Sequence, residues 1–465
     1  MTRKSGALVV AIAAALAVTA ALPAGAAAKT KTLKVCEHGC KYSSIQAAIN
    51  DVKDASSTRI AVQPGTYAGA TVKGHKLDGL TITGTGEEPG DVLIQGVGGQ
   101  VPGPEKRGGD LPQNGIDGLN VSHLELSNMQ ADNFAANGFF IHADPGKECI
   151  GFKMDDLVAS WNRAYGMFAR NCIGGRITDS VGYGHGDSAI YIGETPPQKK
   201  KDRKWTQISR NESYLNVLGY SGTNSKYVDI HDNFFYNNGA GVVPNTLDSE
   251  DFEPTAKGII EDNDIFWNNF DYYMPGSPVQ TVSDGLGELP PEFGGGTLQY
   301  PTGIGVAMFG ASGWKVESNR IFGNFKWGAA SFSDPFNEGD DAINQNNQFI
   351  NNTMSSNGTE ADANGIDFFS DGSGSGNCYS GNDSTTFDDQ PGGEDTAFLY
   401  PGCPAPDPPD AGTGASFGDF DQLEALIGYT VSDPPCHQED SWSRHEHPAF
   451  MDFEPFEVEG ECDPA

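Results

Sequence analysis

The stretch Asp232-Asn233-Phe234-Phe235-Tyr236-Asn237-Asn238 decides the fold, because a close copy of it follows in the chain. The copy is Asp262-Asn263-Asp264-Ile265-Phe266-Trp267-Asn268-Asn269-Phe270, and each phrase indicates an Asx turn that leads into a short aromatic-rich strand. Two apolar phrases, Ser188-Ala189-Ile190-Tyr191-Ile192-Gly193 and Gly239-Ala240-Gly241-Val242-Val243-Pro244, indicate further short strands that end in turns. Recurring units of this kind predict a solenoid, in which each coil repeats the path of the previous one.

The repeat can be followed through its Asx-type corners, which are spaced by 28, 24, 31, 22, 30, 56 and 28 residues. These corners are Asn128, Asp156, Ser180, Asn211, Asn233, Asn263, Asn319 and Asn347. Steps in the twenties suit three short strands and three turns per coil, and a Gly- and Pro-rich insertion at 276–303 explains the step of 56. We expect stacked asparagines to bond coil to coil at the corners, and stacked aromatic rings to fill the interior.

The composition indicates a secreted all-β protein. The chain has 465 residues with 60 glycines and 28 prolines, and long amphipathic helical patterns are nearly absent. Residues 1–28 have the basic start, apolar run and small-residue cleavage site of a signal peptide. No later run is long enough to span a membrane. The formal net charge of −34 argues against binding to nucleic acid or anionic lipid, so a polyanionic partner would need a local basic patch or bridging cations. We expect a monomer.

The start of the mature chain has a recognisable order of elements. A short amphipathic helix is predicted at about 43–54, followed by a strand at 59–62 and the turn Pro64-Gly65-Thr66-Tyr67. This order resembles the opening of pectinesterases and other pectate-lyase-like proteins, in which such a helix plugs the end of a right-handed parallel β-helix. The pectinesterase catalytic phrases are missing, so that activity does not carry over.

The resemblance implies an all-β chain with three parts. These are the signal peptide at 1–28, a right-handed parallel β-helix solenoid at 29–400 with its capping helix, and an irregular tail at 401–465 that contains Pro and Cys and packs on the last coils. Eight cysteines predict disulfides in an oxidising compartment, and nearness in sequence is the guide to their pairing. The expected pairs are Cys36 with Cys40, Cys149 with Cys172, Cys378 with Cys403, and Cys436 with Cys462.

Candidate chemistry lies in the turns that follow the apolar strands. Stacked coils place equivalent turns in a line, so six of these turns are expected on one side of the solenoid. Their polar residues are His142, Asp144, Arg170, Glu194, Asn245, Asp248, Glu250, Asp251, Asp334 and Asp371. A groove lined by carboxylates, one Arg and one His suits a linear sugar chain. Turn carboxylates that merely solvate the corners are the plainer interpretation.

The β-helix resemblance implies specific roles for some of these residues. Family lyases act on uronates with a base and often with calcium, so Arg170 is the candidate base, and Asp144, Glu194 and Asp248 are possible calcium ligands. Glu250 and Asp251 extend the acidic loop that begins at Asn245, and we include them as possible ligands. A hydrolase would instead use two close carboxylates, and Glu194 with Asp248 is the pair to test.

Two further motifs bear on substrate binding. The basic run 198–205 is expected to overhang the groove, where Lys200 and Arg203 would bind uronates and Trp205 would stack on a sugar ring. His142 and Asn245 are expected to contact the same sugar chain. The alternative for the basic run is a solvated loop. Gly184-His185-Gly186 is similar to the Gly-His-Gly of polygalacturonases, but the accompanying phrases come in the wrong order, which favours a turn with a surface His.

Three functions remain open at this point. The first is an extracellular enzyme of the lyase or epimerase type that acts on an acidic, uronic-acid-containing polysaccharide, with Ca²⁺ as a possible cofactor. The second is a non-catalytic secreted solenoid that binds surface polysaccharide or is structural, because the fold hosts both kinds. The third is a glycoside hydrolase.

Overall fold

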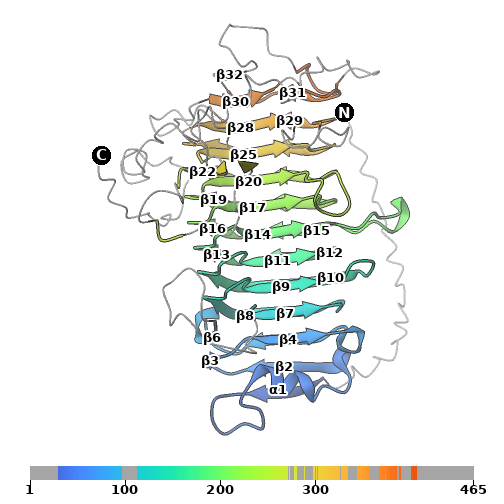
Figure 1. Cartoon of the computed structure of the whole chain (residues 1–465), viewed down its shortest axis with the longest axis vertical. Helices are drawn as coiled ribbons and strands as arrows, with labels where there is room; N and C mark the ends of the chain where they lie inside the picture. Colours follow the sequence, from blue (N-terminus) through green and yellow to red (C-terminus); the bar gives the residue numbers. More distant parts are fainter. Residues whose placement is uncertain are drawn as a thin grey trace, which may run out of the picture.

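The chain winds into one long parallel β-helix, seen in a computed structural model (Figure 1). The structure describes residues 30–96, 113–270, 302–324, 326–333, 343–354, 366–371 and 373–384, with short pieces elsewhere between 272 and 405. The predicted signal peptide, Asp334, Cys436, Cys462 and nearly all of the predicted tail lie outside these residues. Among the described residues, no helix combines the length and the hydrophobicity needed to cross a bilayer.

An eleven-stranded parallel sheet forms one face of the solenoid, and its strands stack as a column in Figure 1. Its strands are β4 (Ala70–Lys73), β7 (Ile116–Leu119), β9 (Phe139–His142), β11 (Met167–Arg170), β14 (Ser188–Gly193), β17 (Leu218–Thr223), β20 (Ala240–Asn245), β25 (Ile304–Phe309), β28 (Trp327–Phe332), β30 (Ile366–Ser370) and β32 (Phe387–Asp388). Six polar turns were predicted to lie on one side of the solenoid, and five of them fall on described residues. These five turns follow β9, β11, β14, β20 and β30 of this one sheet, so their predicted alignment is confirmed.

A nineteen-stranded sheet supplies the other two faces, because the long strands β8 and β10 pair in both of its columns. The first column contains β1 (Lys31–Val35), β2 (Thr58–Val62), β5 (Thr81–Gly84), β8 (Glu125–Asp132), β10 (Cys149–Ser160), β12 (Cys172–Thr178), β15 (Thr206–Ser209), β18 (Val228–His231), β21 (Ile259–Glu261), β26 (Lys315–Glu317), β29 (Gln348–Ile350) and β31 (Cys378–Ser380). The second adds β3 (Gly65–Tyr67), β6 (Val92–Gln95), β13 (Val181–Tyr183), β16 (Glu212–Tyr214), β19 (Phe234–Tyr236), β22 (Asp264–Phe266) and β27 (Arg320–Phe322). A separate antiparallel pair, β23 (Gly287–Glu288) and β24 (Thr297–Leu298), lies within the predicted insertion.

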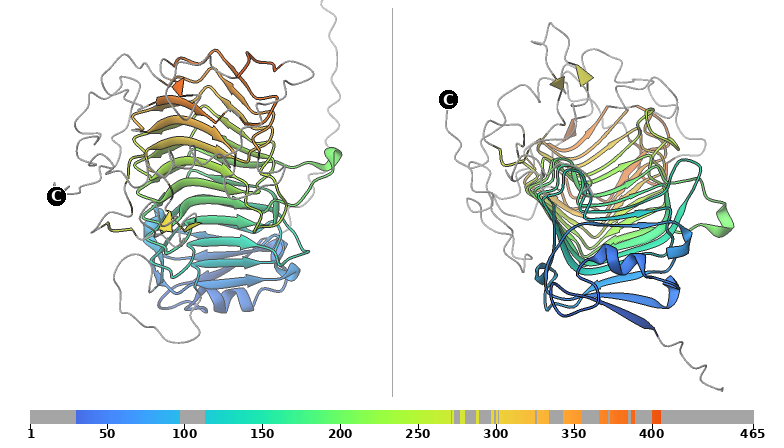
Figure 2. Two further views of the ribbon diagram at one scale, coloured as in Figure 1. Left: turned by 45° about the horizontal axis from the view of Figure 1, so that its top comes forward. Right: turned by 60° about the horizontal axis from the view of Figure 1, so that its bottom comes forward.

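The capping helix is present and shorter than predicted. It is α1 (Ile45–Asn50), and the Ser44 hydroxyl caps it by accepting a hydrogen bond from the Ala47 N–H. Ile45, Ala48 and Ile49 are buried, so the apolar face of α1 covers the first coils, as Figure 2 shows from below. The predicted turn at 64–67 is wrong, because Gly65–Tyr67 forms strand β3 and pairs with β6. The remaining helices are single 3₁₀ turns: η1 (Ala55–Ser57), η2 (His75–Leu77), η3 (Pro89–Asp91) and η4 (Lys200–Asp202).

Two ladders of buried polar residues hold successive coils together. In the first, each rung's backbone N–H donates to the side-chain oxygen of the next; its rungs are Ser180, Asn211, Asn233, Asn263, Asn319, Asn352 and Asn382. The predicted bonding between corner asparagines is therefore confirmed. Asn347 was assigned to the wrong ladder, because it accepts from the Trp314 N–H in another line. Asn128 and Asp156 lie in left-handed backbone conformations at the same bend.

The second ladder explains the Gly-His-Gly motif. Its rungs are Asn162, His185, Asn216, Asn238, Asn268 and Asn324. His185 stands where the other coils have Asn, and its Nδ1 accepts from the Asn162 N–H. Because it is fully buried, the expected surface His is wrong, and burial lowers the pKa of His185 to about 3.

Aromatic stacks lie outside the core rather than within it, which corrects the prediction. Tyr236, Phe266 and Phe322 stack face to face and form a cluster separate from the main core. Their neighbours Phe235 and Ile265 point the other way, into a core in which most side chains are aliphatic. The alternation of a strand explains this, because consecutive side chains lie on opposite faces.

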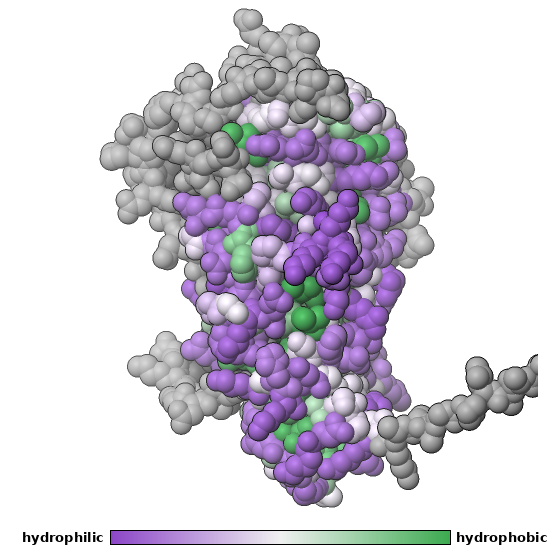
Figure 3. Space-filling model, turned by 90° about the vertical axis from the view of Figure 1, so that its right-hand side faces the viewer, coloured by the Kyte–Doolittle hydropathy of each residue, from purple (hydrophilic) through white to green (hydrophobic). Residues whose placement is uncertain are grey.

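Three of the four expected disulfides are formed: Cys36–Cys40, Cys149–Cys172 and Cys378–Cys403. Cys149 and Cys172 are register partners on β10 and β12, so this bond joins adjacent coils. Figure 3 shows one side of the solenoid as largely hydrophilic, with small separated apolar areas, as the acidic composition leads one to expect.

Candidate active site

An ion pair between adjacent coils marks the centre of the site. Arg170 ends β11, and Glu194 follows the end of β14, the next strand in the sheet. The Arg170 Nε and Nη2 atoms each donate to one carboxylate oxygen of Glu194 at 2.7 Å. The Glu194 side chain is only 2% exposed, whereas that of Arg170 is 44% exposed. The contact raises the pKa of Arg170, which disfavours its predicted role as a base.

Glu194 occupies a backbone position that normally suits asparagine. It has a φ of 47°, and the equivalent residues of neighbouring coils with this left-handed conformation are Asn120, Asn171 and Asn224. The left-handed conformation favours Asn, Asp and Gly, and the longer Glu side chain is energetically less well suited to it. A residue kept in a disfavoured conformation suggests a functional reason, and here it delivers the carboxylate to Arg170.

Beside the ion pair, aromatic rings stack on the outward side of the sheet. Phe140, Phe168 and Tyr191 are register partners on β9, β11 and β14, with centroids 4.3 and 4.6 Å apart. The ring of Tyr165 packs against both Phe168 and Tyr191 at 4.7 Å. Burial raises the pKa values of the Tyr165 and Tyr191 hydroxyls well above the usual range, so both remain protonated.

Glu250 reaches this stack from the loop after β20. The Tyr191 hydroxyl donates to its carboxylate at 3.0 Å. The loop is fixed by the Asn224 side chain, which donates to the Leu247 and Glu250 carbonyl oxygens at 2.8 and 3.0 Å. Burial raises the pKa of Glu250, and the nearby Glu194 carboxylate acts in the same direction.

Asp187 is the most strongly perturbed carboxyl group of the cluster. It precedes β14 and is 7% exposed, and the nearby hydroxyls of Ser188 and Tyr165 act to lower its pKa. Burial is the main cause that raises its pKa to about 7, and the charge of Glu250 adds to it. Burial raises the pKa of Tyr300, and the charges of Asp187 and Glu250 add to this effect. A buried carboxyl that titrates near neutrality beside a phenol is suited to proton transfer.

The cluster lies at a border on the outward side of the sheet. In β4, β7 and β9 the residues alternate between buried and partly or fully exposed, so one side of each strand is open. In β14, β17, β20, β25 and β28 every residue is buried on both sides. We call the outward-facing side chains of β4, β7, β9 and β11 the open strip. It ends at Arg170 and Glu194.

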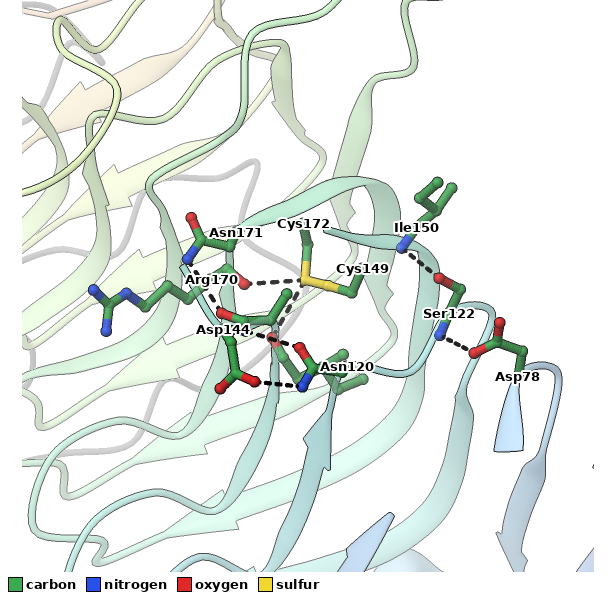
Figure 4. The surroundings of a disulfide bond; sticks show 11 residues. Asp78, Asn120, Ser122, Asp144, Cys149, Ile150, Arg170, Asn171 and Cys172 are labelled. Atoms are coloured by element: carbon green, nitrogen blue, oxygen red, sulfur yellow. Dashed lines mark hydrogen bonds between the residues drawn. A yellow bond between two sulfur atoms is a disulfide. The ribbon is translucent and has the colours of Figure 1, made fainter. Parts of the chain in front are cut away.

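The predicted acidic ligands do not gather at one point. Asp248 and Asp251 are exposed, while Glu250 turns inward to Tyr191. Asp144 accepts from the Asn120 side chain at 2.7 Å and from Lys147 at 2.9 Å, one coil below Arg170 (Figure 4). Within the described part of the chain, no group of three or more His, Cys, Asp or Glu could hold a metal ion.

The predicted substrate-binding residues divide into two sets. His142 lies on the open strip, stacks on Phe140 and contacts Asp117 at 3.0 Å. Asn245 is buried and donates to the Val243 carbonyl oxygen. Asp371 is also buried and accepts from the Ser333 and Ser373 N–H groups, so its expected place in a groove is wrong.

The basic run projects from the solenoid between β14 and β15 (Figure 1). Lys200 lies in η4 and is exposed. Arg203 packs over the ring of Tyr227 at 4.2 Å, and Trp205 meets the same ring edge-on at 5.8 Å. Within the described residues these contacts hold Arg203 and Trp205 to the turn between β17 and β18 rather than to Arg170 or Glu194.

The sequence missed Asp187, Tyr165, Tyr191 and Tyr300. A usable signal was present for Asp187, which directly follows the Gly-His-Gly phrase and precedes the largely apolar run Ala189-Ile190-Tyr191-Ile192 after Ser188. A carboxylate beside a buried strand is rare without a function. Tyr300 carries no such signal, because it belongs to an insertion with no repeat to fix its position.

Known structures with the same fold include enzymes whose names refer to polysaccharides. The A-module of the Azotobacter vinelandii mannuronan C-5 epimerase AlgE6 is 15% identical, with a TM-score of 0.50 over 73% of this chain and 81% of that one. The A-module of AlgE4 from the same organism is 15% identical, with a TM-score of 0.49 over 73% and 84%. A family 28 exopolygalacturonase of Yersinia enterocolitica is 9% identical, with a TM-score of 0.41 over 80% and 78%.

At these identities the likeness concerns the parallel β-helix fold alone. No protein-family model matches the chain. A search of curated proteins also found no match.

Proposed function

We propose that the protein acts on an extracellular polysaccharide containing uronic acids, by removing the proton next to the sugar carboxyl group. The observation that carries the proposal is a cluster of titratable side chains on the outward side of the sheet, in which Glu250, bonded to Tyr191, interacts electrostatically with Arg170 and Glu194 and also with Asp187. The three disulfides agree with an extracellular location.

Arg170 would bind a carboxylate of the substrate chain at a sugar unit near the reacting one. Its Nε and Nη2 atoms are engaged by Glu194, which fixes the guanidinium plane, and 44% of its side chain is exposed. A fixed, charged guanidinium would hold the acidic chain in register with the groups that move the proton. This role replaces that of base and uses the same residue.

Asp187 and Tyr165 would move the proton. Asp187, ionised above its pKa of about 7, would accept the C5 proton, and the nearby Tyr165 hydroxyl would supply the second proton. In a lyase the electron pair left at C5 expels the O4 glycosidic oxygen, which takes a proton from Tyr165. In an epimerase no bond to O4 breaks, and a proton returns to C5 from the other side of the ring.

The open strip supports an acidic substrate despite the acidic composition. Lys73, His142 and Arg170 occupy the same register column on β4, β9 and β11. These three side chains lie in a line along the direction in which coils stack, and Asp117 and Glu194 pair with His142 and Arg170. Lys73 and Arg170 would be the cationic contacts of an acidic polymer along this line.

A glycoside hydrolase remains a second candidate, because Asp187 and Glu250 interact electrostatically and both have raised pKa values. Hydrolysis needs one protonated and one ionised carboxyl group. The pair Asp187 and Glu250 replaces the predicted pair of Glu194 and Asp248, because Glu194 is occupied by Arg170 and Asp248 is exposed.

The test is an activity panel on mannuronan, guluronan, polygalacturonate and glucuronate-containing glycosaminoglycans, each with calcium and with a chelator. Mannuronan is included because the similar epimerases are named for it. Absorbance of unsaturated uronates reports a lyase, deuterium uptake at C5 from heavy water reports an epimerase, and reducing ends alone report a hydrolase. Binding with none of these signals would leave the non-catalytic solenoid as the answer.

Two variants connect the panel to the site. Tyr165→Phe should abolish the signal that the panel finds, either the unsaturated product or the deuterium uptake at C5. Tyr183→Phe, which alters a stacked tyrosine on another face, should leave it unchanged. Equal activity of Tyr165→Phe and the unaltered protein would exclude the proposed proton transfer.

A further inference from the structure

We propose that the open strip is closed at one end, so that the protein engages its polymer at a chain terminus instead of along an uninterrupted groove. The inference rests on the proposed function for the identity of the polymer. Its structural basis is the change in burial along the eleven-stranded sheet.

The change occurs within one coil. Thr71, Asp117 and Phe140 are outward-facing register partners on β4, β7 and β9, and all are partly exposed. Continuing along the same column, the outward residues Ser221, Val243, Ala307, Ala330 and Phe369 are 0 to 6% exposed. A sheet face that is buried over so many coils is packed under other parts of the chain.

Described residues identify part of what covers it. Phe270, Tyr272 and Val279, which lie between β22 and β25, belong to one buried cluster with the outward residues of β17 to β30. Hydrogen bonds fix this segment: the Phe270 N–H donates to the Asn238 carbonyl oxygen at 3.0 Å, and the Tyr272 hydroxyl donates to the Tyr300 carbonyl oxygen at 2.8 Å. Tyr300 then reaches the electrostatic neighbourhood of Asp187.

The covering segment therefore forms a wall beside the proposed chemistry. Glu250 and Tyr300 lie at the edge of this covered part, where Glu250 accepts a hydrogen bond from Tyr191 on β14, and the open strip continues away over β11, β9, β7 and β4. Four strands spaced by about 4.8 Å span roughly 14 Å, enough for a few sugar units. A polymer lying on the strip would meet the wall at the reacting unit, with no path past it.

Oligouronates of defined length test this directly, with binding measured by calorimetry or fluorescence anisotropy. The probes are oligomers from the polymer that the protein recognises, carrying a bulky fluorophore at the reducing end, at the non-reducing end, or at neither. We expect one labelled end to bind like the unlabelled oligomer and the other to bind at least tenfold more weakly. Equal binding of both labelled forms would overturn the closed end, and so would a failure of every oligomer to bind.

This experiment separates the two proposals, because it needs no turnover. If catalysis were absent and the end selectivity present, the proposed function would fail and the closed end would stand. Where turnover occurs, products should appear from the first minutes as a single small size class. A broad ladder of sizes with a rapid fall in viscosity would contradict chain-end action.

A matched pair of lysines tests the strip itself. Lys73→Ala on β4 should raise KM about threefold with little change in kcat for oligomers long enough to reach it, and should not affect shorter ones. Lys34→Ala, an exposed lysine on the other sheet, is the control. An effect of Lys73→Ala on the shortest substrate would place the polymer elsewhere.

Discussion

The Arg170 guanidinium and the Glu194 carboxylate come from neighbouring coils and form a two-point contact at 2.7 Å. Arg210 and Asp179 make the same kind of contact elsewhere, at 2.7 and 2.6 Å. The pairs differ in surroundings, because the Glu194 side chain is 2% exposed and that of Asp179 is 46% exposed. The exposed Arg210–Asp179 pair is therefore a matched control for the buried Arg170–Glu194 pair at the candidate site.

Replacing Glu194 should damage activity far more than stability. In Glu194→Gln the guanidinium loses an ionic partner and its fixed orientation, so we expect kcat on the recognised polymer to fall about 10- to 100-fold, the equivalent of one charge-assisted hydrogen bond. Asp179→Asn should leave kcat unchanged and alter the free energy of unfolding by less than about 1 kcal/mol. Similar kinetics for the two variants would mean that the Arg170 pair is only structural.

The pH dependence should carry the signature of Asp187. Its pKa is raised from the usual value to about 7, so the folded state binds more protons than the unfolded state between about pH 4 and pH 7. This group therefore contributes stability that declines as the pH rises through that window. Activity should change in the opposite direction, because only the ionised carboxylate accepts a proton.

Asp187→Asn should remove both trends, measured by chemical denaturation and by pH–rate profiles of wild type and variant. The difference in unfolding free energy between wild type and variant should be used, because His185 changes the stability in the opposite direction. Its pKa is lowered to about 3, so its contribution to stability grows as the pH rises from about 3 to 6.5. The buried Asp371, with a pKa of about 6, is the matched control. Asp371→Asn should alter stability and leave the pH–rate profile in place.

His185 should tolerate asparagine and little else. Asn is the residue at the other rungs of its ladder, so His185→Asn should preserve both fold and activity and should reduce the loss of stability in acid. His185→Ala removes the acceptor of the Asn162 N–H and should cost about 1–3 kcal/mol of unfolding free energy. Loss of activity in a stable His185→Asn variant would instead indicate a catalytic histidine.

The Cys149–Cys172 disulfide should stabilise the coil that carries Arg170. It closes a loop with a sequence separation of 23 residues, for which the entropic effect on the unfolded chain is about 3 kcal/mol. The double variant Cys149→Ala/Cys172→Ala should lower the melting temperature accordingly, and reductant should have less effect on it than on the wild type. An unchanged melting temperature would show that strand pairing alone holds β10 to β12.

The sequence was a good guide wherever the repeat itself carried the information. Asn233 and Asn263 stand in repeated phrases, and they are successive rungs bonded as expected. The prediction for Asn347 was wrong because the described residues contain more than one asparagine ladder with similar spacing. Spacing alone does not show to which ladder an asparagine belongs. The aromatic stacks failed for a related reason: Phe235 and Tyr236 are adjacent and point to opposite sides, so the register decides which is buried in the core.

The candidate site was predicted in part, for a physical reason. Arg170 and Glu194 were found because stacked turns bring them into line. Glu250 and Tyr300 interact electrostatically with Asp187 from loops that leave the coil, and the path of such loops is not encoded in any periodicity. The role of Arg170 as a base stays a prediction, and the Glu194 partner that raises its pKa becomes visible only in the folded chain.

The spacing between coils is independent of how much chain separates them. Asn263 and Asn319 are 56 residues apart, yet they bond at the same 2.9 Å as Asn233 and Asn263, which are 30 apart. Extra sequence can therefore be added at this corner without disturbing the stack beneath it. Architecture of this kind lets a lineage, or a protein engineer, reshape the mouth of the site by grafting new loops, while the scaffold that aims the reacting groups stays as it was.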